Sequence, residues 1–100
     1  MITLDNFMIE KGKYFANMKG VNTNTQLIKV LFEVAELAEA VNKNDHNNIM
    51  NEGFDVIQSV VTLLSTVDKN LIPGSMDMYF DNWKEKIESY ITEGGKYNNK

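Results

Sequence analysis

Residues 26–40 read QLIKVLFEVAELAEA, the longest segment of the chain with a clear helical pattern of apolar residues. Apolar side chains recur in it every three or four residues, the spacing that places side chains on one face of an α-helix. The polar residues 22–25 just before it, NTNT, can cap the start of a helix. The pattern predicts a helix over about residues 26–42 with this apolar face: Leu27, Val30, Leu31, Val34, Leu37, Ala38 and Val41.

The same helix carries a second apolar side, formed by Ile28, Phe32 and Ala35. A helix that is apolar on two sides is either central in its own bundle or packed against another subunit. A chain of 100 residues has few helices to cover both sides. We therefore expect a homodimer or a homotetramer.

Two further helices are predicted, one before and one after this stretch in the sequence. One precedes it and ends at Gly20. The other follows a polar turn at residues 44–48 and runs over about residues 49–67, where Gly53 indicates a close contact with another helix. The apolar positions are Leu4, Met8, Phe15 and Met18 in the first, and Phe54, Ile57, Val60, Val61 and Leu64 in the second.

A fourth helix is predicted after Pro73, which interrupts the preceding helical pattern. Ser75 is its predicted N-cap, and the helix is predicted to end at Gly94. The prediction is therefore an all-α, four-helix bundle-like fold, with a single domain over residues 1–95 and a flexible tail at residues 96–100. The side chains of the last helix expected to point inward are Met76, Phe80, Trp83, Ile87, Tyr90 and Ile91.

The amino-acid composition argues against several classes of function. The chain has no cysteine and one histidine, which argues against thiolate or histidine-rich metal sites and against a cysteine nucleophile. The net charge is −4, and the ten basic residues are all lysines, which disfavours a nucleic-acid surface. No apolar run reaches the ~18–20 residues of a membrane span, and the first residues lack a signal-peptide pattern. We expect a cytoplasmic domain that binds neither nucleic acid nor membrane.

Two pairs of acids stand out, because Glu33 and Glu36 are three residues apart in one predicted helix and Glu52 and Asp55 in the next. Antiparallel packing across the turn would bring the pairs face to face. Four such carboxylates repel one another unless a cation neutralises them, and oxygen ligands favour Mg²⁺ or Mn²⁺ over zinc or copper. Spacing alone also leaves open a plain solvated surface. A ferritin-like site is excluded, since it needs Glu-x-x-His pairs and His46 falls in the predicted turn.

The stretch 26–40, followed by EGFDVI at residues 52–57, resembles the MazG-like nucleotide pyrophosphohydrolases, which carry an E-x-x-E, spacer, E-x-x-D signature. The similarity covers about residues 25–68. The family usually doubles the first glutamate, and Phe32 stands in the extra position here. The resemblance implies a MazG fold and Mg²⁺-dependent hydrolysis of a nucleoside triphosphate, ribo or deoxy, to the monophosphate and pyrophosphate. The implied Mg²⁺ ligands and catalytic residues are Glu33, Glu36, Glu52 and Asp55.

Further residues are candidates for substrate binding. Lys29, one turn before Glu33, would neutralise a phosphate or pair with Glu33, and we favour the pairing. Gln26 would touch a base or a sugar, or lie on the surface at the start of its helix. The candidate phosphate contacts that the resemblance implies on the last helix are Asn82, Lys84 and Lys86.

A second hypothesis is a non-catalytic oligomeric helical module that only binds a nucleotide or a partner protein. It would have no reason to gather four carboxylates. Among the remaining residues, Trp83 is expected in the core, Glu39 at solvent or a subunit interface, and His46 in a loop.

Overall fold

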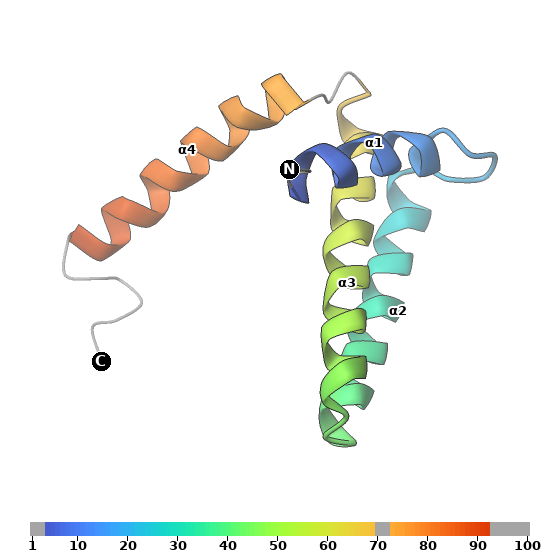
Figure 1. Cartoon of the computed structure of the whole chain (residues 1–100). Helices are drawn as coiled ribbons and strands as arrows, with labels where there is room; N and C mark the ends of the chain where they lie inside the picture. The colour runs from blue at the N-terminus through green and yellow to red at the C-terminus, as the bar shows by residue number, and fades with distance from the viewer. Residues whose placement is uncertain (1–3, 70–72, 93–100) are drawn as a thin grey trace.

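The computed structural model describes residues 4–69 and 73–92, and the regular structure in these ranges is entirely helical. The helices are α1 (Leu4–Ala16), α2 (Thr23–Asn42), α3 (His46–Val67) and α4 (Pro73–Thr92) (Figure 1). The all-α prediction is confirmed. The predicted end of the last helix at Gly94 and the predicted tail at residues 96–100 lie outside the described residues.

Helices α2, α3 and α4 begin earlier than the sequence pattern predicts, and local chemistry explains the starts of α2 and α4. The Asn22 side chain accepts a hydrogen bond from the Thr25 backbone N–H at 2.9 Å, and the Thr25 hydroxyl accepts one from the Asn22 N–H at 2.9 Å. This reciprocal pair satisfies backbone donors of the first turn of α2. Helix α4 begins at Pro73, so the prediction of Ser75 as its N-cap is wrong. Proline suits the first helical position because it lacks the N–H that would be unpaired there.

The turn between α2 and α3 is shorter than predicted. Asn44 adopts the left-handed region with φ 58°, which asparagine tolerates better than most residues. Asp45 then caps α3, and its side chain accepts a hydrogen bond from the Asn48 N–H at 3.2 Å. His46 is therefore the first residue of α3, and its prediction as a loop residue is wrong.

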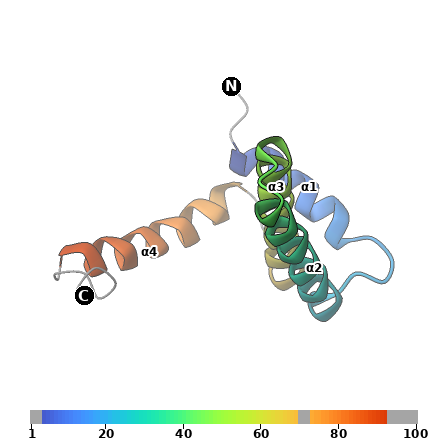
Figure 2. The same ribbon diagram turned by 90° about the horizontal axis from the view of Figure 1, so that it is seen from below.

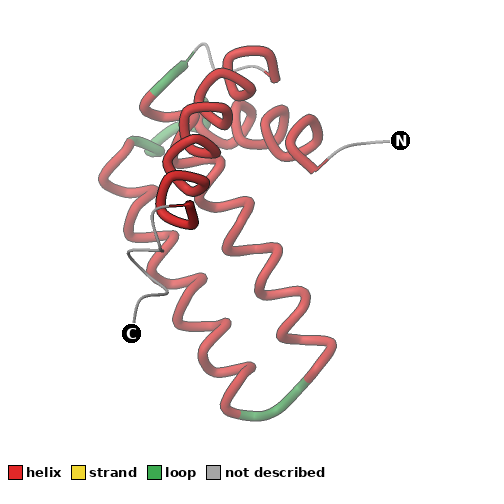
Figure 3. The backbone as a smooth tube through the Cα atoms, turned by 90° about the vertical axis from the view of Figure 1, so that its left-hand side faces the viewer, coloured by secondary structure: helices red, strands yellow, loops and turns green. Residues whose placement is uncertain are grey.

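Helices α2 and α3 form an antiparallel hairpin, which Figures 1 and 3 show from two directions. At the open end, the hydroxyls of Thr23 and Thr66 lie 3.0 Å apart. Further along, the buried Gln26 donates from Nε2 to the Ser59 carbonyl oxygen at 3.0 Å. These contacts set the register between the two helices, which places the acids of α2 opposite those of α3.

Helix α1 crosses the hairpin near its open end and packs on α3 (Figure 3). The approach is close at Gly12, where an added Cβ would lie 3.0 Å from Ser65 Oγ and 3.2 Å from Val61 Cγ1. A Cβ at Gly53 would have no such neighbour within 4 Å. The predicted close contact at Gly53 is therefore wrong, because α1 crosses the other half of α3 and the tight position lies on α1 itself.

Helix α4 extends away from the other three helices, as Figures 1 and 2 both show. It contacts α1 but neither α2 nor α3 in the described part of the chain. The Tyr79 hydroxyl donates to Asp68 Oδ2 at 3.1 Å. Phe80 and Trp83 stack with ring centroids 5.6 Å apart, and both are about half exposed. The expectation of a core position for Trp83 is therefore wrong within a single chain, and the four described helices of one chain do not all pack together. Periodicity identifies the side of a helix that favours burial, and it does not specify which helix covers that side.

The outer faces of α2 are likewise uncovered. Val30 is the one residue of the predicted apolar face that is buried, while Leu31 is 60% exposed and Phe32, on the second apolar side, is 63% exposed. The chain thus exposes apolar surface that a single globular core would bury.

Within the described residues, no helix is both long enough and apolar enough to cross a lipid bilayer.

Candidate functional site

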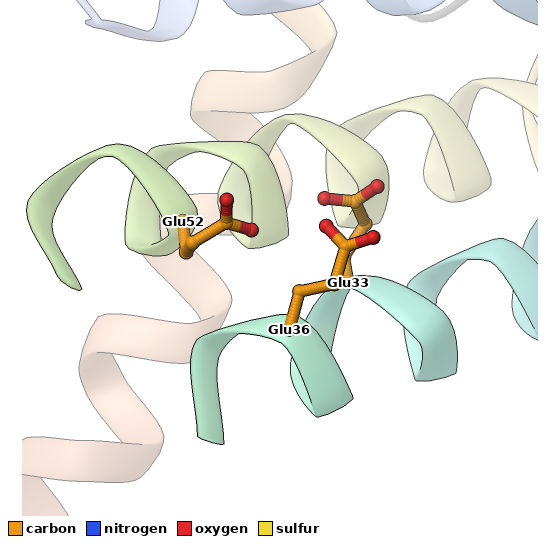
Figure 4. A group of neighbouring side chains, drawn as sticks. All are labelled: Glu33, Glu36 and Glu52. Carbon is orange, nitrogen blue, oxygen red and sulfur yellow. The ribbon is translucent and has the colours of Figure 1, made fainter. Parts of the chain in front are cut away.

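Three of the four predicted acids meet between α2 and α3. Glu33 and Glu36 lie one turn apart on α2, and Glu52 faces them from α3, as Figure 4 shows. One carboxylate oxygen from each lies within 4.8 Å of the others. The helical spacing of three residues and the antiparallel register together produce this convergence.

Glu33 is the most buried of the three, with 7% of its surface exposed. Its Oε1 atom lies 3.0 Å from Lys29 Nζ, across one helical turn. The hydrogen bond to Glu33, and then the charge of Glu33, raise the pKa of Lys29 above its usual value. The favoured prediction, that Lys29 pairs with Glu33, is confirmed.

The environment of Glu52 disfavours the charged form of its carboxyl group. Its Oε2 atom is buried and has no hydrogen-bond partner among the described residues. Loss of solvation raises the pKa of Glu52 above its usual value, and the adjacent Glu36 carboxylate raises it further, with smaller contributions from Asp55 and Glu33. A buried carboxylate oxygen without a partner is costly. A bound cation would remove that cost and the mutual repulsion together.

Asp55 occupies the edge of the group rather than its centre. It is exposed and is not one of the three acids whose oxygens converge. It lines a cleft together with Glu33, and its charge contributes to the raised pKa values of Lys29 and Glu52. The structure therefore brings the four predicted acids into one region, with three in direct proximity.

The donor set fits a hard divalent cation. Carboxylate oxygens are the ligands that Mg²⁺, Mn²⁺ and Ca²⁺ prefer, and sulfur and imidazole ligands are absent from this group. An ion bound here would contact oxygens of Glu33, Glu36 and Glu52, with coordination positions left for water or a ligand. The arrangement identifies a possible metal site without identifying the metal.

A cleft of about 570 Å³ adjoins the acids. Glu33 and Asp55 belong to its wall, together with Gln26 and Lys29 of α2. Gln26 is 8% exposed and hydrogen-bonded to the Ser59 carbonyl oxygen. Of the two expectations for Gln26, the surface position is therefore wrong. Phe15, Met18, Lys19 and Val21, from the end of α1 and the connection after it, also line the cleft.

The candidate phosphate contacts on α4 are not near the acids within one chain. Asn82, Lys84 and Lys86 are exposed on α4, which contacts neither α2 nor α3. Lys84 and Lys86 instead lie over the rings of Phe80 and Tyr90, at 5.6 and 5.9 Å from the ring centroids. Phosphate contacts from these residues remain a prediction, which would require α4 from another copy or a different position of α4.

Glu39 of α2 and Lys19 of the connection after α1 lie outside the group of three acids. Glu39 pairs with Lys43 at 2.8 Å on the exposed side of α2, which fits both of its expected positions, solvent and a subunit interface. Lys19 lines the cleft, and no sequence pattern predicts this position for it. It lies in the connection after α1, and helical periodicity carries no signal for the placement of such a connection.

Comparisons of this chain with protein-family models, with curated proteins and with solved structures give no match.

Proposed function

We propose that this protein is a Mg²⁺-dependent nucleoside triphosphate pyrophosphohydrolase that works in the cytoplasm and releases a ribo- or deoxynucleoside monophosphate and pyrophosphate. The observation that carries the proposal is the convergence of Glu33, Glu36 and Glu52, whose oxygens lie within 4.8 Å of one another. The buried Oε2 of Glu52, without a hydrogen-bond partner in the part of the chain that the structure describes, supports it. The E-x-x-E and E-x-x-D spacing, which resembles that of MazG-like enzymes, supports the same reaction.

The acids explain why a cation would be needed for such a substrate. A triphosphate carries about four negative charges and would be repelled by a bare carboxylate group. Bound Mg²⁺ would supply charge neutralisation, polarisation of phosphate oxygens and a coordinated water of lowered pKa. The side chains of Glu33, Glu36 and Glu52 would hold the ion, with Asp55 supporting it from the edge.

The proposed reaction is attack of water on the α-phosphorus. A bond forms between the water oxygen and the α-phosphorus, the bond from that phosphorus to the oxygen bridging it to the β-phosphorus breaks, and pyrophosphate leaves. Glu36 would accept the water proton, because it is exposed while Glu33 is held in an ion pair with Lys29. The ammonium of Lys29 lies at the same cleft and would offset phosphate charge.

We also propose that the active form is a homodimer or a homotetramer. Leu27, Leu31 and Val34 of α2 are exposed. At about 100° per residue, they and Ile57, Val60 and Leu64 of α3 lie on the side of the hairpin away from the acids.

The same exposed faces favour the second candidate function, a helical module that binds a partner protein without catalysis. Large exposed apolar patches mark interaction surfaces whether or not a site is catalytic. Under this alternative the acids have no chemical role, so the substitution that neutralises one of them should not affect function.

The products of hydrolysis test the proposal. The protein is incubated with each common nucleoside triphosphate, ribo and deoxy, in the presence of Mg²⁺, and pyrophosphate and orthophosphate are measured separately. The proposal predicts pyrophosphate from at least one substrate, a loss of orders of magnitude in Glu52→Gln, and retained activity in Glu39→Gln. Orthophosphate as the product, or equal rates in both variants, would reject it.

A further inference from the structure

Helix α4 has one apolar side, and most of that side is exposed. At about 100° per residue, its apolar side chains fall within about a third of the helix circumference: Tyr79, Phe80, Trp83, Ile87, Tyr90 and Ile91. Phe80 and Trp83 are about half exposed, and Ile91 is 61% exposed. In the described part of the chain α4 contacts α1 alone, and Figures 1 and 2 show it extending away from the hairpin. Exposed aromatic side chains gathered on one side of a helix mark an interaction surface.

Helix α2 carries a second exposed apolar surface. Ile28, Phe32 and Ala35 form an apolar stripe about two turns long, and all three residues are exposed. The stripe lies between the edge of α2 that carries Glu36 and the side that carries Leu31. MazG-like sequences usually have a glutamate where this chain has Phe32, so the apolar stripe is a property of this chain and does not follow from the resemblance.

The charges beside these two surfaces are complementary. On α2 the apolar stripe is bordered by Glu36, about 40° from Phe32 around the helix. On α4 one border of the apolar side carries Lys86 and no acid, while the other carries a lysine and two acids, Asp77 and Glu88. Packing that sets the Lys86 border beside Glu36 is attractive, and the reverse direction would place two more acids there. Charge therefore selects one direction of α4 on α2.

The α4 helix of the same chain does not cover the apolar stripe. Its position is set by the Tyr79 hydroxyl, which donates to Asp68 Oδ2 at 3.1 Å, and by the contact with α1. Among the described residues, α4 in this position meets neither helix of the hairpin. A second copy of the chain carries both surfaces, so it can supply the helix that is missing.

From these observations we infer that α4 of a second copy packs on the apolar stripe of α2. Phe32 lies against the Phe80 and Trp83 rings of the second copy, and Glu36 lies beside its Lys86. Because the same contact can form in both directions, the exchange of α4 closes as a two-fold dimer and covers both apolar surfaces. This contact is separate from the side of the hairpin on which the proposed assembly rests, and it does not depend on catalysis.

The fluorescence of Trp83 reports this contact directly, because Trp83 is the only tryptophan of the chain. Tryptophan emission shifts to shorter wavelength when the indole ring leaves water. Emission and light scattering are recorded over a dilution series from tens of micromolar to nanomolar protein, without nucleotide or metal. The variant is Phe32→Glu, at a position that is 63% exposed in the single chain. Asn47→Glu is the control, because it adds the same charge at an exposed position of α3.

Wild type and Asn47→Glu should emit at short wavelength as oligomers and at long wavelength as monomers. At equal concentration Phe32→Glu should emit at longer wavelength than both, and it should need at least about tenfold more protein for the same shift. Three results would each overturn the inference: long-wavelength emission of the wild type at every concentration, short-wavelength emission of a monomer, or equal emission of Phe32→Glu and Asn47→Glu. The second would mean that α4 folds onto its own chain, and the third that another surface covers Trp83.

A second pair of variants tests the charges on α4 without a change in α2. Lys86→Glu should raise the protein concentration needed for the shift by roughly two- to fivefold, because it places an acid beside Glu36. Lys84→Glu is the matched control on the opposite border, since each lysine lies over an aromatic ring, at 5.9 and 5.6 Å from the centroid. Lys84→Glu should behave as the wild type does. Equal midpoints for the two variants would contradict the inferred packing, even if Phe32→Glu fails to fold.

The contact and the proposed function fail independently. The fluorescence series contains no nucleotide and no Mg²⁺, so its result does not bear on hydrolysis. Absence of pyrophosphate in the product assay would in turn reject the proposed function and leave the exchange of α4 standing.

Discussion

Gln26 of α2 and Ser59 of α3 are joined across the hairpin by a buried hydrogen bond of 3.0 Å from the amide Nε2 to the carbonyl oxygen. A buried side-chain amide bonded to a backbone carbonyl of another helix restricts sliding, because a shift in register would leave the amide unsatisfied. Two turns further along α2 lies Glu33, which this register sets beside Glu52. The position of the acid group therefore depends on a polar contact outside it.

The contact between α1 and α3 predicts a contrast between two glycines. A glycine-to-alanine change inside a helix gains about 1 kcal/mol from backbone propensity. Gly53→Ala should show this gain, because its Cβ meets no atom within 4 Å. Gly12→Ala places its Cβ 3.0 Å from Ser65 Oγ and 3.3 Å from the Val61 carbonyl oxygen, so it should be less stable than Gly53→Ala by about 1 kcal/mol or more. Urea unfolding of the two variants measures the difference, and equal stabilities would contradict the packing of α1.

The raised pKa of Glu52 predicts the pH dependence of the metal-free protein. The folded chain holds the Glu52 proton more tightly than the unfolded chain, because its pKa is raised above the ordinary 4.5. Acidification from neutral pH should therefore stabilise the folded state until the pH falls below 4.5, and this contribution is lost as the pH rises through the folded pKa.

Glu52→Gln removes this titration. Melting curves in EDTA at several pH values should show a smaller gain on acidification for this variant than for the wild type. Glu39→Gln is the control, since the pKa of Glu39 is shifted downward by Lys43 instead. An identical dependence of stability on pH for wild type and Glu52→Gln would show that the fold does not raise the pKa of Glu52.

The exposed face of α2 predicts the assembly state. Leu31 is 60% exposed in a single chain, so Leu31→Glu would hardly affect an isolated monomer. If this face packs against a second copy, the added charge should dissociate the oligomer, which light scattering at tens of micromolar protein detects. Asn47→Glu is the control, because it adds the same charge at an exposed polar position in the first turn of α3. A wild-type monomer at this concentration would contradict the predicted assembly.

Asp55→Asn separates chemistry from stability. Asp55 is exposed, and the substitution conserves size, so the fold should be unchanged. Its charge contributes to the raised pKa of Glu52, so its removal should slightly stabilise the metal-free protein. If the proposed function is right, turnover should fall by orders of magnitude, because the cation would be positioned by charge as well as geometry. Wild-type turnover in Asp55→Asn, measured as pyrophosphate release, would remove Asp55 from the site.

Local sequence signals predict the helices well, because helix caps and apolar periodicity act over a few residues. The acids could be predicted as a group for the same reason: Glu33 and Glu36 share a helix face, and a short turn forces α3 to return beside them. The burial pattern could not be predicted in this way. Val30 and Leu31 are equally apolar and adjacent, yet one is buried and the other exposed, because burial depends on which helix arrives from elsewhere.

The cleft could not be predicted from local sequence signals either. Phe15 and Met18 fit the apolar period of the first helix, which predicts a core position, but they are exposed and line the cleft. The reason is that α1 ends at Ala16, so Met18 belongs to the connection and not to a helical stripe. Gly20, with φ +85°, then turns the chain back toward α2.

The central claim is that Glu33, Glu36 and Glu52 hold one divalent cation together. Titration of the protein with Mn²⁺, followed by the electron paramagnetic resonance signal of free Mn²⁺, tests it without dependence on substrate or product. Saturable binding by the wild type and by Glu39→Gln is predicted, with affinity lost by at least about tenfold in Glu36→Gln and in Glu52→Gln, since each removes one charged ligand. Equal Mn²⁺ affinity in all four proteins, or no saturable binding by the wild type, would contradict it.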